Sequence, residues 1–166
     1  NDLLTDIQTL KSKGITPISV GGKDKWPDAF YWENFVLQEC PKDTVTKALD
    51  AKKMDDPCFV KAGQDLQNFI ATDPFNKGYL ATSAQQGAGS SAGLVATGKA
   101  AMELMGAWDP GVMGGILKDA KSQADATPPS FLGFFNFPSV AGAAGDPSAV
   151  LGGGDGFACA TWAPPE

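Results

Sequence analysis

The stretch Ala100–Gly111 ends with an aromatic ring beside a carboxylate, Trp108 and Asp109. Such a pair suits a sugar ring, because the C–H face of the sugar packs on an indole while its hydroxyls need fixed acceptors. The short apolar run before the loop predicts a buried strand over 100–106. Trp108 would then lie at the carboxyl end of a strand, where open α/β sheets form ligand crevices. The alternative is an ordinary core tryptophan.

Two further glycine-rich loops, 21–27 and 152–157, each follow a predicted strand. Glycine lets a backbone approach a ligand closely, so its N–H and C=O groups can take part in binding. In the first loop Trp26 lies among lysine and aspartate side chains, which favours a ligand-facing ring over a core role. The second loop lacks the spacing of a dinucleotide or P-loop fingerprint. The alternatives are a solvated loop and a plain turn.

Carboxylates that could hydrolyse a glycosidic bond are present, but their spacing indicates no acid–base pair. Hydrolysis needs two carboxyl groups held roughly 5–10 Å apart. Glu103, inside the predicted strand, is expected to alternate outward as a surface residue. A glycan-processing enzyme that uses Glu103 and Asp155 is therefore the alternative function, and the main prediction is a protein that is not an enzyme and needs no cofactor.

The composition of the 166-residue chain excludes several classes of function. Hydrophobic residues make up 43% and charged residues 19%, which indicates a globular protein, and the length is that of one domain. The net charge is −6, all 13 basic residues are lysine, and histidine is absent. Without arginine, nucleic-acid binding is disfavoured. Without histidine, the histidine-dependent catalytic triads and the commonest transition-metal ligand are missing, so no metal site is predicted.

The three cysteines, Cys40, Cys58 and Cys159, do not follow a zinc-binding pattern. Cys40 and Cys58 flank a predicted short helix, so a disulfide between them is sterically reasonable and would indicate an oxidising compartment. Cys159 is then a buried thiol or pairs with a cysteine outside this chain. Three reduced thiols are the alternative.

Short strands alternating with helices predict an α/β layered fold. Trp32 and the phenylalanines Phe134, Phe135 and Phe137 are expected to pack in the core. The chain begins as the middle of an amphipathic helix and ends as a helix start, which predicts a piece of a longer polypeptide. Helices are expected over 2–13, 28–38, 43–52, 56–70, 87–97 and for about ten residues from 109, and strands over 15–20, 100–106 and 130–138.

Three blocks in the same order, Gly14–Pro27, Gly98–Gly111 and Gly152–Phe157, resemble the extracellular solute-binding proteins of ABC sugar importers. The likeness is to the maltose- and multiple-sugar-binding kind, in particular to actinobacterial oligosaccharide binders. The resemblance implies that residues 1–166 form a single α/β lobe, the second in chain order, of a two-lobed binding protein. Its fold would be type II periplasmic-binding-protein-like, with a short mixed sheet flanked by helices.

The resemblance also implies a site, a partner and a location. The partners would be an oligosaccharide and the permease subunits of the importer, and the protein would be a monomer at the extracellular face of the membrane, secreted or as a lipoprotein. A receptor for a peptide, polyamine or other solute is the alternative on the same fold. By this analogy Trp108 stacks on a pyranose ring, Asp109 and Asp155 accept hydroxyl hydrogens, the Gly153 and Gly154 backbone approaches the sugar, and Trp26 and Lys25 line the same cleft.

Overall fold

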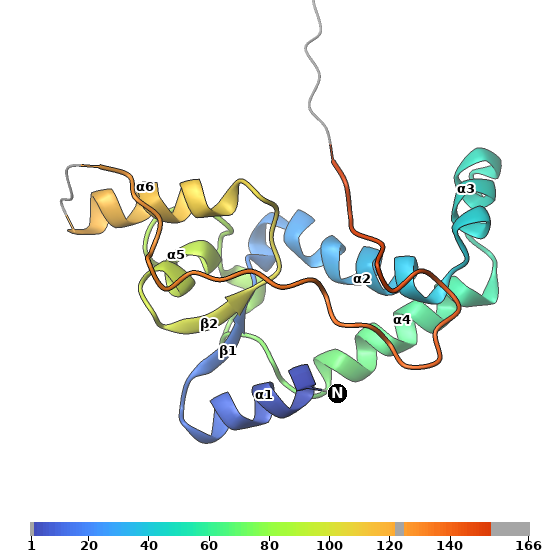
Figure 1. Ribbon diagram of the computed structural model, residues 1–166, viewed down its shortest axis with the longest axis horizontal. Helices are drawn as coiled ribbons and strands as arrows, with labels where there is room; N and C mark the ends of the chain where they lie inside the picture. The colour runs from blue at the N-terminus through green and yellow to red at the C-terminus, as the bar shows by residue number, and fades with distance from the viewer. Residues whose placement is uncertain (1, 122–124, 154–166) are drawn as a thin grey trace, which may run out of the picture.

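The computed structural model describes residues 2–121 and 125–153, with helices arranged around a small two-stranded sheet (Figure 1). The α/β class expected from the sequence is confirmed. In chain order the elements are α1 (Asp2–Ser12), β1 (Thr16–Ser19), the 3-10 turn η1 (Gly22–Asp24), α2 (Trp26–Glu39), α3 (Lys42–Ala51), α4 (Pro57–Ile70), the 3-10 turn η2 (Tyr79–Ala81), α5 (Ser91–Ala96), β2 (Ala100–Glu103) and α6 (Asp109–Lys121).

The two strands pair in parallel, with Thr16 opposite Ala100 and Ile18 opposite Met102. A further parallel bridge joins Ile18 to Phe75 on the other edge of β1. The sheet of the described residues is therefore parallel, whereas a mixed sheet was expected. Parallel pairing follows from the long connection between the strands, which contains helices and returns the chain to the same end of the sheet.

Two apolar clusters form the core. The larger one lies between the sheet and helices α1, α2 and α4, with Ile7, Ile18, Tyr31 and Phe69 among its buried members. Figure 1 shows α2 and α4 running side by side toward the end of the molecule from which α3 projects. The smaller cluster packs α5 against α6. Together the two clusters fix the positions at which α2 and α6 begin.

Local sequence signals set where several helices begin. Asp56 caps α4, its carboxylate accepting a hydrogen bond of 2.9 Å from the Cys58 N–H, as the sequence predicts. Ser90 caps α5 by accepting from the Gly93 N–H at 3.1 Å. The predicted helix over 87–97 was therefore too long, because Ser90 starts the helix and Gly87 adopts a left-handed conformation (φ 81°) that a helix cannot contain.

The predicted disulfide between Cys40 and Cys58 is present, with their Cα atoms 5.2 Å apart. It joins the end of α2 to the first turn of α4 and so closes the segment that contains α3. Trp32 packs against Phe59 with the ring centroids 6.4 Å apart, which confirms its structural role.

The segment after α6 crosses the molecule from α6 toward the C-terminal end of α2 (Figure 1). The strand predicted over 130–138 is wrong, since these residues are irregular. Gln38 provides hydrogen-bond partners instead: its amide donates to the Pro138 carbonyl, and its oxygens accept from the backbone N–H groups of Val140 and Gly145. Two of the phenylalanines expected in the core are exposed, because this segment lies on the surface. They are Phe134, at 88% exposure, and Phe135, at 59%.

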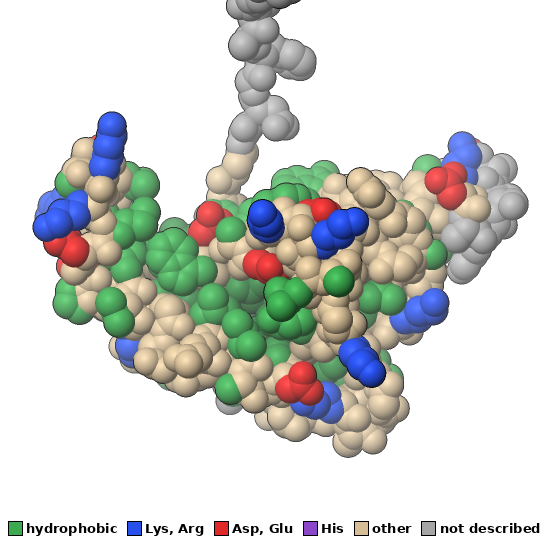
Figure 2. Space-filling view, turned by 180° about the vertical axis from the view of Figure 1, so that it is seen from behind, with side chains coloured by type: hydrophobic (Ala, Val, Ile, Leu, Met, Phe, Trp, Pro, Cys, Tyr) green, Lys and Arg blue, Asp and Glu red, His purple; other side chains and the backbone are tan. Residues whose placement is uncertain are grey.

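Figure 2 shows hydrophobic side chains gathered across the middle of the reverse face, with lysine and acidic side chains around them. Phe137 joins the core, with its ring centroid 5.4 Å from that of Phe35. Among the described residues, none of the helices combines the length and apolar character that crossing a membrane requires.

Candidate functional site

Two exposed tryptophans meet at the carboxyl ends of the parallel strands. The chain leaving β1 passes through η1 into Trp26, and the chain leaving β2 carries Trp108. Because the strands are parallel, both loops lie at the same edge of the sheet, where α/β folds bind ligands. The centroids of the two indoles are 6.3 Å apart and their planes are inclined by 52°. Phe30 lies 5.4 Å from Trp26 in an edge-to-face arrangement. We call Trp26, Phe30 and Trp108 the aromatic platform.

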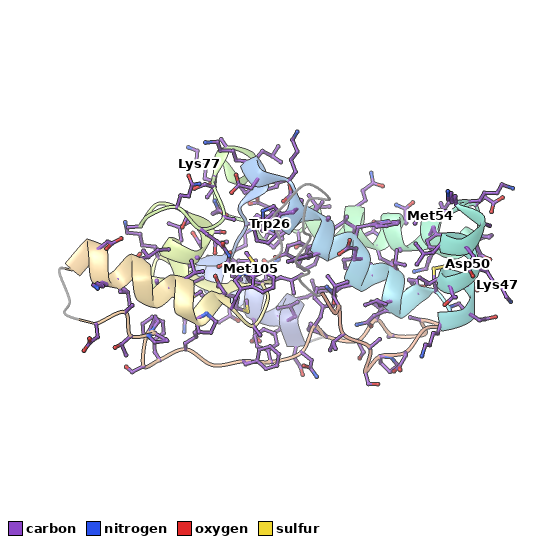
Figure 3. All side chains as sticks on the ribbon, turned by 90° about the horizontal axis from the view of Figure 1, so that it is seen from above. Trp26, Lys47, Asp50, Met54, Lys77 and Met105 are labelled. Atoms are coloured by element: carbon purple, nitrogen blue, oxygen red, sulfur yellow. A yellow bond between two sulfur atoms is a disulfide. The ribbon has the colours of Figure 1, made fainter. Side chains whose placement is uncertain are left out.

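The platform is open to solvent. Trp108 is 53% exposed and Trp26 is 38% exposed, so the reading of Trp108 as a core residue is wrong. Figure 3 shows Trp26 at the start of α2, over the middle of the molecule, with Met105 of the β2–α6 loop nearby in that view. Two large apolar rings that remain half in water provide stacking surface to a ligand.

Hydrogen bonds from a neighbouring loop hold the Trp26 side of the platform. The Asp24 carboxylate accepts from the Ala84 N–H at 2.7 Å, and the buried Asn76 side chain accepts from the Val20 N–H at 2.8 Å. Lys25 is exposed and adopts a positive φ of 68°, which is uncommon for a residue other than glycine. The turn at Lys25 directs the chain into α2, whose first residue is Trp26.

The Trp108 side depends on a glycine. The indole of Trp108 lies over Gly106, and a Cβ built at Gly106 would overlap the six-membered ring. The Asp109 N–H donates to the Gly106 carbonyl at 3.0 Å, and the Gly111 N–H donates to the Trp108 carbonyl at 3.0 Å. The sequence predicted Gly106 only as a strand boundary. The need for a glycine beneath the Trp108 indole can be recognised only when the direction of the Trp108 side chain is known.

Two buried carboxyl groups lie behind the Trp108 loop. Both oxygens of Glu103 and one of Asp109 are buried and accept no hydrogen bond from the described residues. Burial, followed by the nearby charge of Asp109, raises the pKa of Glu103 to about 9. Burial raises the pKa of Asp109 to about 6. The expectation that Glu103 alternates outward was wrong, because both of its carboxyl oxygens are buried beside Asp109, the first residue of α6.

Asp109 is only 4% exposed. Its side chain is therefore buried, and its carboxyl lies next to that of Glu103. The sequence predicts Asp109 as an acceptor for sugar hydroxyls at the rim. In the structure Asp109 instead pairs with Glu103, which strand alternation predicted to be a surface residue.

A separate apolar cavity of about 720 Å³ lies between the β2–α6 region and the segment 128–138. Met102, Leu104 and Phe131 contribute apolar walls, and the Glu103–Asp109 pair lies at its lining. Neither tryptophan of the platform lines it. The cavity is thus distinct from the platform, and the loop 104–107 borders it.

The remaining predicted site residues fall at the end of the described chain. Gly153 is exposed and irregular. Asp155, Gly154, Cys159 and Trp162 lie outside the described residues. Within the described ranges, no group of three or more acidic or cysteine side chains is arranged to hold a metal ion.

Two comparisons with known proteins found similarities, one to a family model and one to a solved structure. Residues 1–161 match the family model for bacterial extracellular solute-binding proteins. A similar solved structure comes from work on xylan utilisation by the thermophilic bacterium Caldanaerobius polysaccharolyticus, with 29% sequence identity and a TM-score of 0.69. The similarity covers 87% of this chain but 34% of the other, so this chain spans about a third of that protein's length. A search of curated proteins found no match.

Proposed function

Because the chain belongs to the bacterial extracellular solute-binding protein family, we propose that it forms one α/β lobe of an ABC-importer receptor that binds an oligosaccharide. The family assignment supports a receptor role, and the similarity to a structure from work on xylan utilisation supports a sugar as the solute. In this proposal residues 1–166 form a single lobe of a two-lobed protein.

The observation that carries the proposal is the pair of half-exposed indoles 6.3 Å apart at the carboxyl edge of a parallel sheet. Their faces suit the C–H surfaces of pyranose rings, and each aromatic contact contributes about 1 kcal/mol beyond simple area burial. An isolated surface aromatic would need no explanation, but two in contact with each other form an apolar patch that a ligand can cover.

Polar groups around the platform would orient the sugar. Lys25 is exposed, and in this proposal its ammonium group donates to hydroxyls, while the predicted contacts of Asp155, Gly153 and Gly154 complete the polar set. The predicted hydroxyl contact of Asp109 is not part of this proposal, since its carboxyl is buried.

The receptor would act by binding alone. Closure of a second lobe over the platform would bury the sugar, and the permease subunits of the importer would recognise the closed form. The proposal places this protein outside the cytoplasmic membrane, secreted or lipid-anchored, and monomeric. The comparisons give no support to the enzyme alternative.

Isothermal titration calorimetry on the natural full-length protein tests this proposal. The titrants are xylotriose, cellotriose and maltotriose, with spermidine and a tripeptide as non-sugar solutes. We expect micromolar or tighter binding of at least one trisaccharide and a loss of about 10- to 100-fold in Trp108→Ala, because the removed indole provides both stacking and apolar burial.

Phe134→Ala is the control, since it removes an aromatic ring that is more exposed than Trp108 and is not part of the platform. Its affinity should equal that of the wild type. Binding of spermidine or the peptide alone would contradict a sugar receptor. Unchanged trisaccharide affinity in Trp108→Ala would contradict the platform as the binding site.

A further inference from the structure

The two buried carboxyl groups occupy the two ends of the loop that carries Trp108. Glu103 is the last residue of β2 and Asp109 is the first residue of α6, so the loop between them is residues 104–108. The two side chains lie close enough to form a hydrogen bond when one of them is protonated. A bond between them would therefore close the loop across its base.

We propose that Glu103 and Asp109 share one proton, and that this carboxyl pair is the positioning element that holds the Trp108 indole in place. The effect of the carboxyl pair on ligand affinity rests on the proposed sugar-binding function, but the effect of the pair on the position of the indole does not. With one proton present, the neutral carboxyl donates to the charged one. With none present, two buried negative charges repel each other at the base of the loop.

The surroundings supply no positive charge that would let both groups ionise. In the described part of the chain, both Glu103 oxygens and one Asp109 oxygen lack a hydrogen-bond donor. A buried carboxylate without donors is costly, and two adjacent ones cannot both ionise readily. Asp109 is the natural holder of the charge, because it lies in the first turn of α6, where the helix dipole favours a negative group.

The groups facing the pair from neighbouring elements do not neutralise it. From α5, Ser91 lies beside Glu103 and lowers the pKa of that carboxyl, but its hydroxyl carries no charge and donates to the Ala84 carbonyl. From α2, Tyr31 is buried close to Glu103, and Asp28 adds a second negative charge near Tyr31. The other cavity-lining side chains from α1, α4 and the segment 128–138 are apolar. No lysine contributes to the pKa of either carboxyl in the described structure.

The sign of the pH dependence follows from these shifts. Both pKa values are raised, Glu103 to about 9 and Asp109 to about 6, so the folded protein binds protons more tightly than the unfolded chain. Between those values the pair holds one proton, and the arrangement described is favoured. As the pH rises through about 9 the proton is lost, the loop is destabilised and the indole is released from its place.

Nuclear magnetic resonance on the natural full-length protein, without ligand, tests the pair directly. One label is carbon-13 in the glutamate carboxyl groups and the other is nitrogen-15 in the tryptophan indoles, with Trp108 assigned from Trp108→Phe. We expect the Glu103 carboxyl to titrate well above the usual glutamate range, and the Trp108 indole signal to move with the same midpoint. In Glu103→Gln the indole signal should no longer change with pH.

Asp109→Asn gives a reciprocal test, since removing its charge should lower the midpoint of the Glu103 titration. Glu33→Gln is the control for the loss of a glutamate and should leave the Trp108 signal of the wild type unchanged at every pH. Titration of Glu103 in the ordinary glutamate range would overturn the proposal. So would a Trp108 signal that does not respond while Glu103 titrates.

Calorimetry with the tightest-binding trisaccharide at pH 7.0 and 9.5 connects the pair to affinity. If the carboxyl pair and the sugar site are coupled by a free energy of the usual magnitude, the affinity is about tenfold weaker at the higher pH. This difference should be absent in Glu103→Gln. Equal pH dependence in wild type and Glu103→Gln would overturn the link to affinity. Absence of trisaccharide binding at both pH values would contradict the proposed function. The two NMR titrations need no ligand, so they test the carboxyl pair independently of that function.

Discussion

At the scale of single residues, the position of the Trp108 indole decides what the platform offers a ligand. Trp108 remains half exposed because its ring lies over Gly106 rather than in the core. The sequence could indicate a ligand-facing tryptophan, since the ring follows a short strand and precedes an aspartate. It could not indicate the buried Glu103–Asp109 pair, because strand alternation assumes an uncovered outer face, whereas both carboxyl oxygens of Glu103 are buried in the structure.

Gly106→Ala should weaken sugar binding about as much as removal of the indole itself. A methyl group at this position overlaps the six-membered ring of Trp108, so the ring must leave its place in the platform. Calorimetry with the trisaccharide that the wild type binds measures the effect, and near-ultraviolet circular dichroism reports the separation of the two indoles.

Gly111→Ala is the matched control, because a Cβ at Gly111 meets no atom within 4 Å. It should bind as the wild type does. Wild-type affinity in Gly106→Ala would show that the position of the Trp108 ring does not matter for binding.

At the scale of elements, the sequence predicts well where a local signal acts alone. The cap at Asp56 and the proline after it fix the start of α4 in both the prediction and the structure. The strand predicted over 130–138 fails because an aromatic-rich apolar run needs a neighbouring strand with which to pair. In the structure its last residue, Pro138, accepts a hydrogen bond from the Gln38 side chain at the end of α2, and the following Val140 N–H donates to the same side chain. Such a long-range partner leaves no signal in the local pattern.

Helix α6 contains adjacent glycines that should respond oppositely to the same substitution. A Cβ at Gly114 would lie 2.6 Å from the Ala126 carbonyl oxygen, whereas one at Gly115 meets nothing within 4 Å. Gly115→Ala should therefore raise the free energy of unfolding by about 0.5–1 kcal/mol, since alanine favours the helix. Gly114→Ala should lower it by roughly 1–3 kcal/mol, because the backbone after α6 must shift.

Urea unfolding of the two variants beside the wild type, followed by circular dichroism, measures both changes. The opposite order, or equal effects, would show that the segment after α6 does not pack against the helix as described.

At the scale of the whole molecule, three sequence blocks placed the chain in its family before any packing was known, and the family match over residues 1–161 confirms that assignment. The disulfide between Cys40 and Cys58 was also accessible from the sequence, because the two cysteines flank one helix. The contact between the two tryptophans was expected only by analogy, since 82 positions separate Trp26 from Trp108. The parallel pairing of β1 with β2 brings them together.

The central claim is that this contact between tryptophans is where a sugar binds. A crystal structure of the natural full-length protein with its tightest-binding trisaccharide tests it most directly. We expect a pyranose ring stacked at van der Waals distance on Trp108, with Trp26 contacting the same or the adjoining sugar unit. A bound trisaccharide that touches neither indole would show that the sugar binds elsewhere.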